Sequence, residues 1–138
     1  MSGSLVCGGE HAYELNCINF ENGTWKTMPF NLQEERVDHV SWRRADGKTR
    51  LLGGLYSPFT SELVSESGSV SGFPMKYSTM YACSIELEDR VIVTGGYYTR
   101  NTVSIYYDDG WHQDLADLNT GRYWHSCSHY ISENELVY

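Results

Sequence analysis

The chain has 138 residues, 41% of them hydrophobic and 20% charged, as is typical of one folded domain. Its net charge of −8 argues against nucleic acid or an anionic membrane surface as a partner, and no apolar run approaches the ~20 residues that span a membrane. Tyrosine and glycine are abundant, with 11 and 13 copies against three prolines, so strands joined by turns are favoured and we expect an all-β protein.

A double glycine after an apolar run recurs along the chain. It appears as Gly8-Gly9, as Gly53-Gly54 and as Gly95-Gly96, at a period of roughly 40–50 residues that is typical of repeat folds. Glycine permits a sharp turn and a close approach of neighbouring backbone, because it carries no Cβ. The repeat divides residues 1–138 into three units, near 5–49, 50–90 and 91–138.

The first and last units each place a tryptophan after a predicted hairpin turn. Trp25 follows the turn at 21–24 and Trp111 follows the turn at 108–110, whereas residues 63–70 of the middle unit hold no aromatic residue. Asn-Gly in the first turn is a strong hairpin signal. We expect both tryptophans to occupy the same place in their units, packed against the double-glycine strand.

An Arg-x-x-His pattern precedes the second double glycine at Arg36–His39 and recurs at Arg122–His125. In the middle copy Ser78 and Tyr81 replace the arginine and the histidine. The same alignment makes three further residues equivalent: Ser41, Cys83 and Cys127. Because they are repeated, Arg36, His39, Arg122 and His125 are expected to be structural.

The apolar run, the double glycine and the spaced aromatic residues resemble the kelch-repeat family of β-propellers, which includes the galactose-oxidase-like propellers. The resemblance covers nearly the whole chain, with its main departure at 61–75, and it implies blades of four antiparallel strands. Propellers close with 4–8 blades, so we expect an incomplete arc of about three blades, a fragment whose open blade edges favour self-association. The structural repeat residues are Gly8, Gly9, Trp25, Arg36, His39, Gly53, Gly54, Gly95, Gly96, Trp111, Arg122 and His125.

The four cysteines offer two pairs. Cys7 ends one predicted strand and Cys17 begins the next, and opposed antiparallel residues lie ~4.5–5.5 Å apart, within reach of a disulfide. Two buried free thiols are the alternative for this pair. Cys83 and Cys127 are able to bridge two units, but equivalent positions recur without converging, so we expect them to remain unbridged. A disulfide requires an oxidising compartment, which favours an extracellular over a cytoplasmic location.

The stretch from His125 through Cys127 to His129 places three metal-binding residue types on one face of a strand. Structural zinc takes four ligands, usually with a turn between pairs, so we interpret this stretch as packing and expect no metal and no other cofactor. The chain also shows no nucleophile with a base, no phosphate-binding loop and no close carboxylate pair. We therefore expect no enzymatic activity.

Loops at one end of the predicted blades are rich in residues that dominate binding interfaces, which are Tyr, Trp and Arg. In kelch modules this face recognises peptides, so the resemblance implies a non-catalytic module that binds a protein or peptide ligand. The alternative is a fragment of a secreted carbohydrate-binding or galactose-oxidase-like propeller protein. The candidate ligand-binding residues are Tyr13, Tyr56, Phe59, Tyr77, Tyr97, Tyr98, Arg100, Tyr123 and Trp124.

Overall fold

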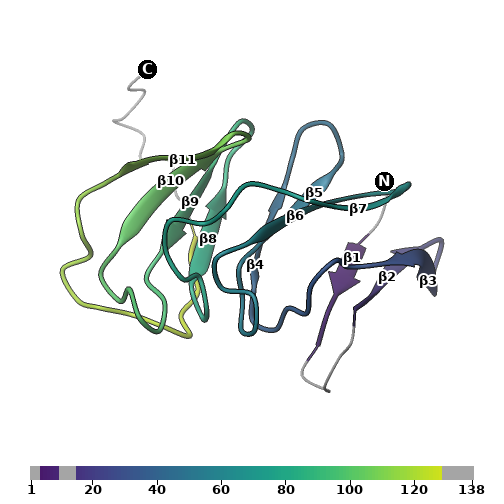
Figure 1. The fold of residues 1–138 in the computed structure, drawn as a ribbon, viewed down its shortest axis with the longest axis horizontal. Coiled ribbons are helices and arrows are strands. Elements are labelled where there is room, and N and C mark those ends of the chain that lie inside the picture. The colour runs from purple at the N-terminus through teal and green to yellow at the C-terminus, as the bar shows by residue number, and fades with distance from the viewer. Residues whose placement is uncertain (1–3, 10–14, 129–138) are drawn as a thin grey trace.

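The computed structural model describes residues 4–9 and 15–128, which form eleven strands in three antiparallel sheets (Figure 1). This confirms the all-β prediction. The described residues contain no helix that is long and apolar enough to cross a membrane. The first sheet contains β1 (Ser4–Cys7), β2 (Asn16–Glu21) and β3 (Thr24–Asn31). The middle sheet contains β4 (Val40–Arg43), β5 (Thr49–Leu52), β6 (Ser61–Ser65) and β7 (Gly68–Ser71), and the third contains β8 (Cys83–Glu86), β9 (Val91–Thr94), β10 (Val103–Tyr107) and β11 (Gly110–Asp114).

The last hairpin of each sheet has the same register. The second residue pair from the turn is Phe20 with Trp25 in the first sheet and Tyr106 with Trp111 in the third sheet. In the middle sheet, Ser69 of β7 holds the position of the tryptophan. In the first turn Asn22 and Gly23 both have positive φ, 50° and 78°, as a type I′ hairpin turn requires. Trp25 and Trp111 therefore occupy one register position in two sheets.

The expected packing of these tryptophans against the double-glycine strand is wrong. They lie on β3 and β11, and β2 and β10 separate those strands from β1 and β9. Trp25 is 54% exposed and Trp111 is 41% exposed. Trp25 contacts the Phe20 ring at a centroid distance of 5.0 Å, and the Lys76 ammonium lies 3.7 Å from the Trp111 ring centroid.

Strand pairing corrects the alignment of the middle and third sheets by one residue. Val40 pairs with Leu52, and Cys83 pairs with Thr94, and each partner directly precedes a double glycine. Cys83 is thus the equivalent of Val40 and not of Ser41, because the turn between β8 and β9 is shorter than the turn between β4 and β5. The same shift places Thr79 at the position of Arg36, Tyr81 at that of Asp38 and Ala82 at that of His39.

Two apolar clusters join the sheets. Leu51 and Leu52 are successive on β5, so their side chains point to opposite faces of the middle sheet. Leu51 packs toward the first sheet with Cys7, Cys17, Leu32 and Val64. Leu52 packs toward the third sheet with Val40, Trp42, Met75, Val91, Val93 and Tyr106. The middle sheet is therefore buried on both faces, and each fully buried large apolar side chain contributes about 1.5–3 kcal/mol.

The first glycine of each pair marks the place where the chain entering the next sheet packs most closely. Its φ is positive in all three copies, at 72°, 58° and 64°, and a Cβ there would overlap neighbouring atoms. The overlaps are of Gly8 with the Arg36 carbonyl oxygen, of Gly53 with the Thr79 hydroxyl and of Gly95 with the Arg122 carbonyl oxygen. These three partners follow the corrected alignment, so the glycine repeat is a repeat of contacts between neighbouring sheets.

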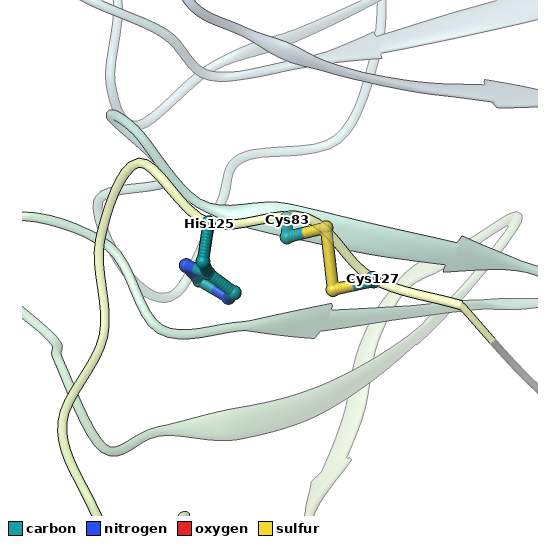
Figure 2. Close-up of side chains that lie close together, drawn as sticks. All are labelled: Cys83, His125 and Cys127. Carbon is teal, nitrogen blue, oxygen red and sulfur yellow. A yellow bond between two sulfur atoms is a disulfide. The ribbon is translucent and has the colours of Figure 1, made fainter.

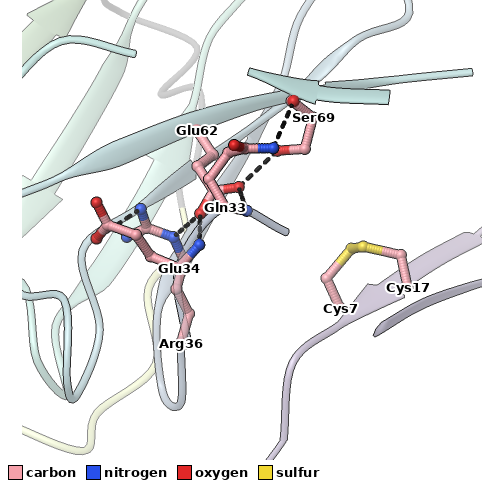
Figure 3. Close-up of a disulfide and its surroundings, with 7 residues drawn as sticks. All are labelled: Cys7, Cys17, Gln33, Glu34, Arg36, Glu62 and Ser69. Atoms are coloured by element: carbon pink, nitrogen blue, oxygen red, sulfur yellow. Dashed lines mark hydrogen bonds and ion pairs between the residues drawn. A yellow bond between two sulfur atoms is a disulfide. The ribbon is translucent and has the colours of Figure 1, made fainter. Parts of the chain in front are cut away.

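Arg36 and Glu62 form a buried ion pair that ties the connector before β4 to the centre of the middle sheet (Figure 3). Each residue is 1% exposed, and Arg36 Nε donates a hydrogen bond to Glu62 Oε1 at 3.0 Å. Arg36 Nη1 donates to the carbonyl oxygens of Gly53 at 2.8 Å and Thr60 at 3.1 Å, and Nη2 donates to the Thr60 hydroxyl at 2.8 Å.

The Glu62 carboxylate has three further donors (Figure 3). It accepts hydrogen bonds from the backbone N–H groups of Gln33 at 2.8 Å and Glu34 at 3.0 Å. The Ser69 hydroxyl donates to it at 2.5 Å. A buried ion pair stabilises a fold only when its remaining polar atoms are satisfied, and here donors from two segments surround the carboxylate.

Replacing Gly95 with alanine should destabilise the protein far more than replacing Gly23. Both glycines have positive φ, 64° and 78°, but a Cβ on Gly95 would overlap the Arg122 carbonyl oxygen while a Cβ on Gly23 meets nothing within 4 Å. We expect Gly95→Ala to lower the free energy of unfolding by about 3 kcal/mol and Gly23→Ala by about 1 kcal/mol. Urea denaturation of both variants measures this, and equal losses would contradict the packing role.

Removing the Glu62 charge should leave the buried Arg36 guanidinium with one counterion, the partly exposed Glu34 carboxylate at 3.8 Å. We expect Glu62→Gln to lower the free energy of unfolding by about 3–5 kcal/mol, as breaking a buried pair does. Glu88→Gln changes the same chemistry at an exposed turn and should stay within about 0.5 kcal/mol of the wild type. Thermal and urea unfolding of both variants decide the point, and a stable Glu62→Gln protein would refute it.

Candidate functional site

Five aromatic side chains meet beside the double glycine of the third sheet, and we call them the aromatic cluster: Tyr81, Tyr97, Tyr98, Tyr123 and Trp124. Tyr81 lies 4.5 Å from Trp124 and 6.3 Å from Tyr97 between ring centroids. Tyr97 contacts Tyr98 at 5.0 Å and Tyr123 at 5.5 Å, both edge to face. Tyr123 and Trp124 are 5.7 Å apart. Such ring pairs each add about 0.5–1.5 kcal/mol beyond area burial, so the cluster supports its own shape.

Three chain segments bring these rings together through backbone hydrogen bonds. Tyr97 N–H donates to the Met80 carbonyl oxygen, and Trp124 N–H donates to the Tyr81 carbonyl oxygen, both at 2.9 Å. Tyr81 and Trp124 adopt positive φ, 58° and 50°, which is uncommon for aromatic residues. Asp38, the equivalent of Tyr81 in the middle sheet, has a φ of 51°. Strained positions of this kind cost about 1–3 kcal/mol and gather at functional sites.

Arg100 supplies the cationic group of the aromatic cluster. Its guanidinium carbon lies 4.8 Å from the Tyr123 ring centroid and 5.8 Å from that of Tyr97, within the range of cation–π attraction. Its Nε donates to the Tyr97 carbonyl oxygen at 3.4 Å, and its own carbonyl oxygen accepts from Arg122 N–H at 2.8 Å. Arg100 thus links the loop after β9 to the segment before Trp124.

The outer members of the cluster are strongly exposed. Trp124 is 70% exposed and Tyr98 is 73% exposed, while Tyr97 and Tyr123 are about half as exposed, at 41% and 37%. Contiguous exposed aromatic surface held by defined contacts is typical of interaction sites. The rings of Tyr81, Tyr97 and Tyr123 therefore support the two more exposed rings, Tyr98 and Trp124.

An open groove of about 570 Å³ runs past the cluster toward the first sheet. The residues that line it include Tyr81 and Trp124 of the cluster, Gly8-Gly9 and the segment Val37–His39. A second groove of about 460 Å³ lies along β1 and β4 and shares Val6, Cys7 and His39 with the first. The exposed Asp38 carboxylate adds a negative charge to this lining, whereas Arg36, which also lines the groove, is buried and paired with Glu62.

His39 is the titratable group of the groove whose pKa departs most from its ordinary value. The pKa of His39 is lowered from 6.5 to about 4, chiefly by burial and also by the nearby Arg36 charge, while the Glu62 charge opposes both. His39 Nδ1 is buried and has no hydrogen-bond partner within the described residues. The imidazole is therefore neutral near pH 7.

The structure places the candidate residues of the sequence analysis in three groups. Tyr97, Tyr98, Arg100, Tyr123 and Trp124 come together in the cluster. Tyr56 and Phe59 are exposed, at 64% and 55%, on the loop between β5 and β6. Tyr77 lies at the edge of the third sheet, where its hydroxyl donates to Asp114 Oδ2 at 2.7 Å. Tyr13 lies outside the described residues.

Sequence reasoning missed two residues of the site, Tyr81 and Asp38. Tyr81 was interpreted as a substitute for the repeated histidine, whereas the corrected alignment pairs it with Asp38. The turn between β8 and β9 is one residue shorter than the turn between β4 and β5, and this difference shifts the alignment so that Tyr81 matches Asp38.

The cysteines form two disulfides. Cys7 and Cys17 are directly opposed on β1 and β2, with their Cα atoms 4.1 Å apart, and are bonded as the hairpin spacing predicts. Cys83 and Cys127 are also bonded, with Cα atoms 5.9 Å apart (Figure 2). The expectation that this pair stays unbridged is wrong, because the segment carrying Cys127 runs beside β8. Two disulfides fit an oxidising, extracellular environment.

His125 lies beside the second disulfide (Figure 2). One ligand atom from each of Cys83, His125 and Cys127 lies within 4.8 Å of the other two. Burial lowers the pKa of His125, and the Arg122 charge lowers it further. The sequence stretch that was interpreted as packing thus contributes two of three clustered metal-binding side chains.

Comparison with known proteins leaves the family open: no family model matches the chain, and no curated protein matches it by sequence.

The pKa of His39 predicts a specific loss of stability in mild acid. The unfolded imidazole takes up a proton near pH 6.5 and the folded one near pH 4, so the stabilisation is complete above pH 6.5 and is lost as pH falls toward 4. We expect up to about 3 kcal/mol of the decline over this range to disappear in His39→Asn.

Urea denaturation of the wild type and of His39→Asn at a series of pH values measures the difference. His112→Asn, at an exposed position on β11, is the matched control and should keep the wild-type pH dependence. Identical pH curves for the wild type and His39→Asn would show that His39 titrates normally in the folded protein.

Proposed function

We propose that the chain is part of a kelch-type β-propeller and that the aromatic cluster with its groove binds a protein or peptide ligand without catalysis. On this proposal the three sheets are blades, which the shared hairpin register and the repeated glycine contacts support. Proline-rich and extended peptides dock in aromatic-lined grooves elsewhere. The groove beside the aromatic cluster is likewise lined by two aromatic side chains, Tyr81 and Trp124.

The observation that carries the proposal is the exposure of Trp124 and Tyr98 on a support of packed rings. Rigid aromatic side chains lose little conformational entropy when a ligand binds. The Asp38 carboxylate of the groove and the net charge of −8 favour a ligand with positive charge. We therefore propose a basic peptide segment as the ligand.

A secreted carbohydrate-binding propeller is the second candidate. The two disulfides fit a secreted protein, and an exposed tryptophan is able to stack on an apolar sugar face. The two candidates differ in the ligand that the same cluster selects.

Selection from a random peptide display library and from an immobilised glycan panel tests both candidates. We expect enriched peptides that carry Lys or Arg, and their affinity by fluorescence anisotropy should fall at least about 10-fold in Trp124→Ala and in Tyr98→Ala, as for interface hot spots. Trp25→Ala removes an aromatic ring that is 54% exposed on β3 and should leave binding unchanged.

Glycan hits that depend on Trp124 would favour the second candidate. Peptides that bind Trp124→Ala and Tyr98→Ala as well as the wild type would refute the cluster as the site. Because Trp124 has positive φ, circular dichroism must first show that each variant is folded. If Trp124→Ala does not fold, the binding measurement on Tyr98→Ala decides the test.

A further inference from the structure

The strongest grouping outside the aromatic cluster is formed by Cys83, His125 and Cys127 (Figure 2). Cys83 is the first residue of β8, and the other two lie on the neighbouring segment after Trp124. Their ligand atoms lie within 4.8 Å of one another. A tetrahedral zinc ion, with Zn–S of about 2.3 Å and Zn–N of about 2.0–2.1 Å, holds its ligand atoms roughly 3.3–3.8 Å apart. Small movements would therefore bring all three onto one ion.

Thr94 organises the imidazole of this group. Its hydroxyl lies 2.9 Å from His125 Nε2 and 3.2 Å from Cys127 Sγ. The other ring nitrogen, His125 Nδ1, is buried without a hydrogen-bond partner within the described residues. Metal-binding histidines use one nitrogen for the metal and the other for a hydrogen bond that fixes the ring. In His125 the Thr94 hydroxyl contacts Nε2, and Nδ1 is the nitrogen that has no hydrogen-bond partner within the described residues.

We propose that Cys83, Cys127 and His125 form a zinc site when the disulfide between the two cysteines is reduced, with a water molecule as the fourth ligand and Thr94 as a positioning residue for the imidazole. Two thiolates and one imidazole suit Zn²⁺ and other borderline or soft ions, whereas Mg²⁺ and Ca²⁺ require oxygen ligands. The proposal does not depend on the proposed binding function.

The change between the two states balances through thiol–disulfide exchange. A dithiol reductant gives two electrons and two protons to the sulfur–sulfur bond, so that Cys83 and Cys127 become thiols and the reductant becomes a disulfide. Zn²⁺ then displaces the two thiol protons and binds the thiolates. In an oxidising compartment the pair stays bonded, and in a reducing one it binds metal.

The Cys83–Cys127 disulfide is more exposed to solvent than the Cys7–Cys17 disulfide. Cys83 and Cys127 are both partly exposed, and Ser126 and Ser128 next to Cys127 are exposed. Cys17 is fully buried and Cys7 is only 9% exposed. Since exchange requires a thiolate to reach a sulfur atom, a mild reductant should open Cys83–Cys127 first.

Titration of the mildly reduced full chain with Co²⁺ under anaerobic conditions tests the proposal. We expect a stoichiometric complex with the visible bands of tetrahedral Co²⁺ and a thiolate charge-transfer band, which Zn²⁺ then removes. Cys127→Ser should lose the charge-transfer band, and Thr94→Val should weaken binding about 10-fold, as loss of an outer-shell partner does. The double variant Cys7→Ser/Cys17→Ser should bind like the wild type.

A second measurement needs no variant of the site. Zn²⁺ should slow alkylation of Cys83 and Cys127 in the reduced wild type at least 10-fold by peptide mass spectrometry, without protecting Cys7 and Cys17. Absence of the cobalt spectrum in the reduced wild type, its persistence in Cys127→Ser, or unchanged alkylation of Cys83 and Cys127 would each overturn the proposal.

Discussion

The buried Arg36–Glu62 pair is the interaction on which the groove depends. Removing both charges from water costs several kcal/mol for each ion, and the surrounding donors and carbonyl oxygens offset that cost. The pair holds the connector before β4 against β6, so the next residues, Val37–His39, line the groove. Burial is the main reason that the His39 imidazole stays neutral; the Arg36 charge adds to this effect and the Glu62 charge opposes it.

The double glycines transmit this arrangement from sheet to sheet. Gly8 and Gly95 each lie against the carbonyl oxygen of an arginine, Arg36 or Arg122. The residue two positions after that arginine has a positive φ both times, at Asp38 and at Trp124. Tyr81 occupies the same place after Gly53. The repeated glycine contact is thus accompanied by a positive φ at three equivalent positions, which hold Asp38, Tyr81 and Trp124. Two of these three residues are aromatic, and both belong to the aromatic cluster.

Local patterns in the sequence predicted the strands, the Asn22-Gly23 hairpin and the Cys7–Cys17 bridge, because each depends on residues that lie close in the chain. The position of Tyr81 was not predictable in this way, since one deleted turn residue shifted the alignment. Cys83 and Cys127 were expected to stay apart because they hold equivalent positions in the repeat. That argument ignores that the segment carrying Cys127 runs beside β8, which begins at Cys83. The repeat placed the tryptophans against the double-glycine strand, yet they lie on the edge strands β3 and β11, where Lys76 and Phe20 cover only part of their surface.

The aromatic cluster and the cysteine pair share the same two segments. Tyr81 stands shortly before Cys83 and Trp124 shortly before Cys127, and the rings of Tyr81 and Trp124 are 4.5 Å apart. Any bond between the two sulfur atoms therefore limits how far these rings separate. Restricting a binding surface before a ligand arrives reduces the ordering cost of association, and a crosslink placed this close to two strained residues, with φ of 58° and 50°, opposes their relaxation to ordinary backbone angles. On the proposed function, the covalent link and the exposed rings are consequently parts of one preorganised surface.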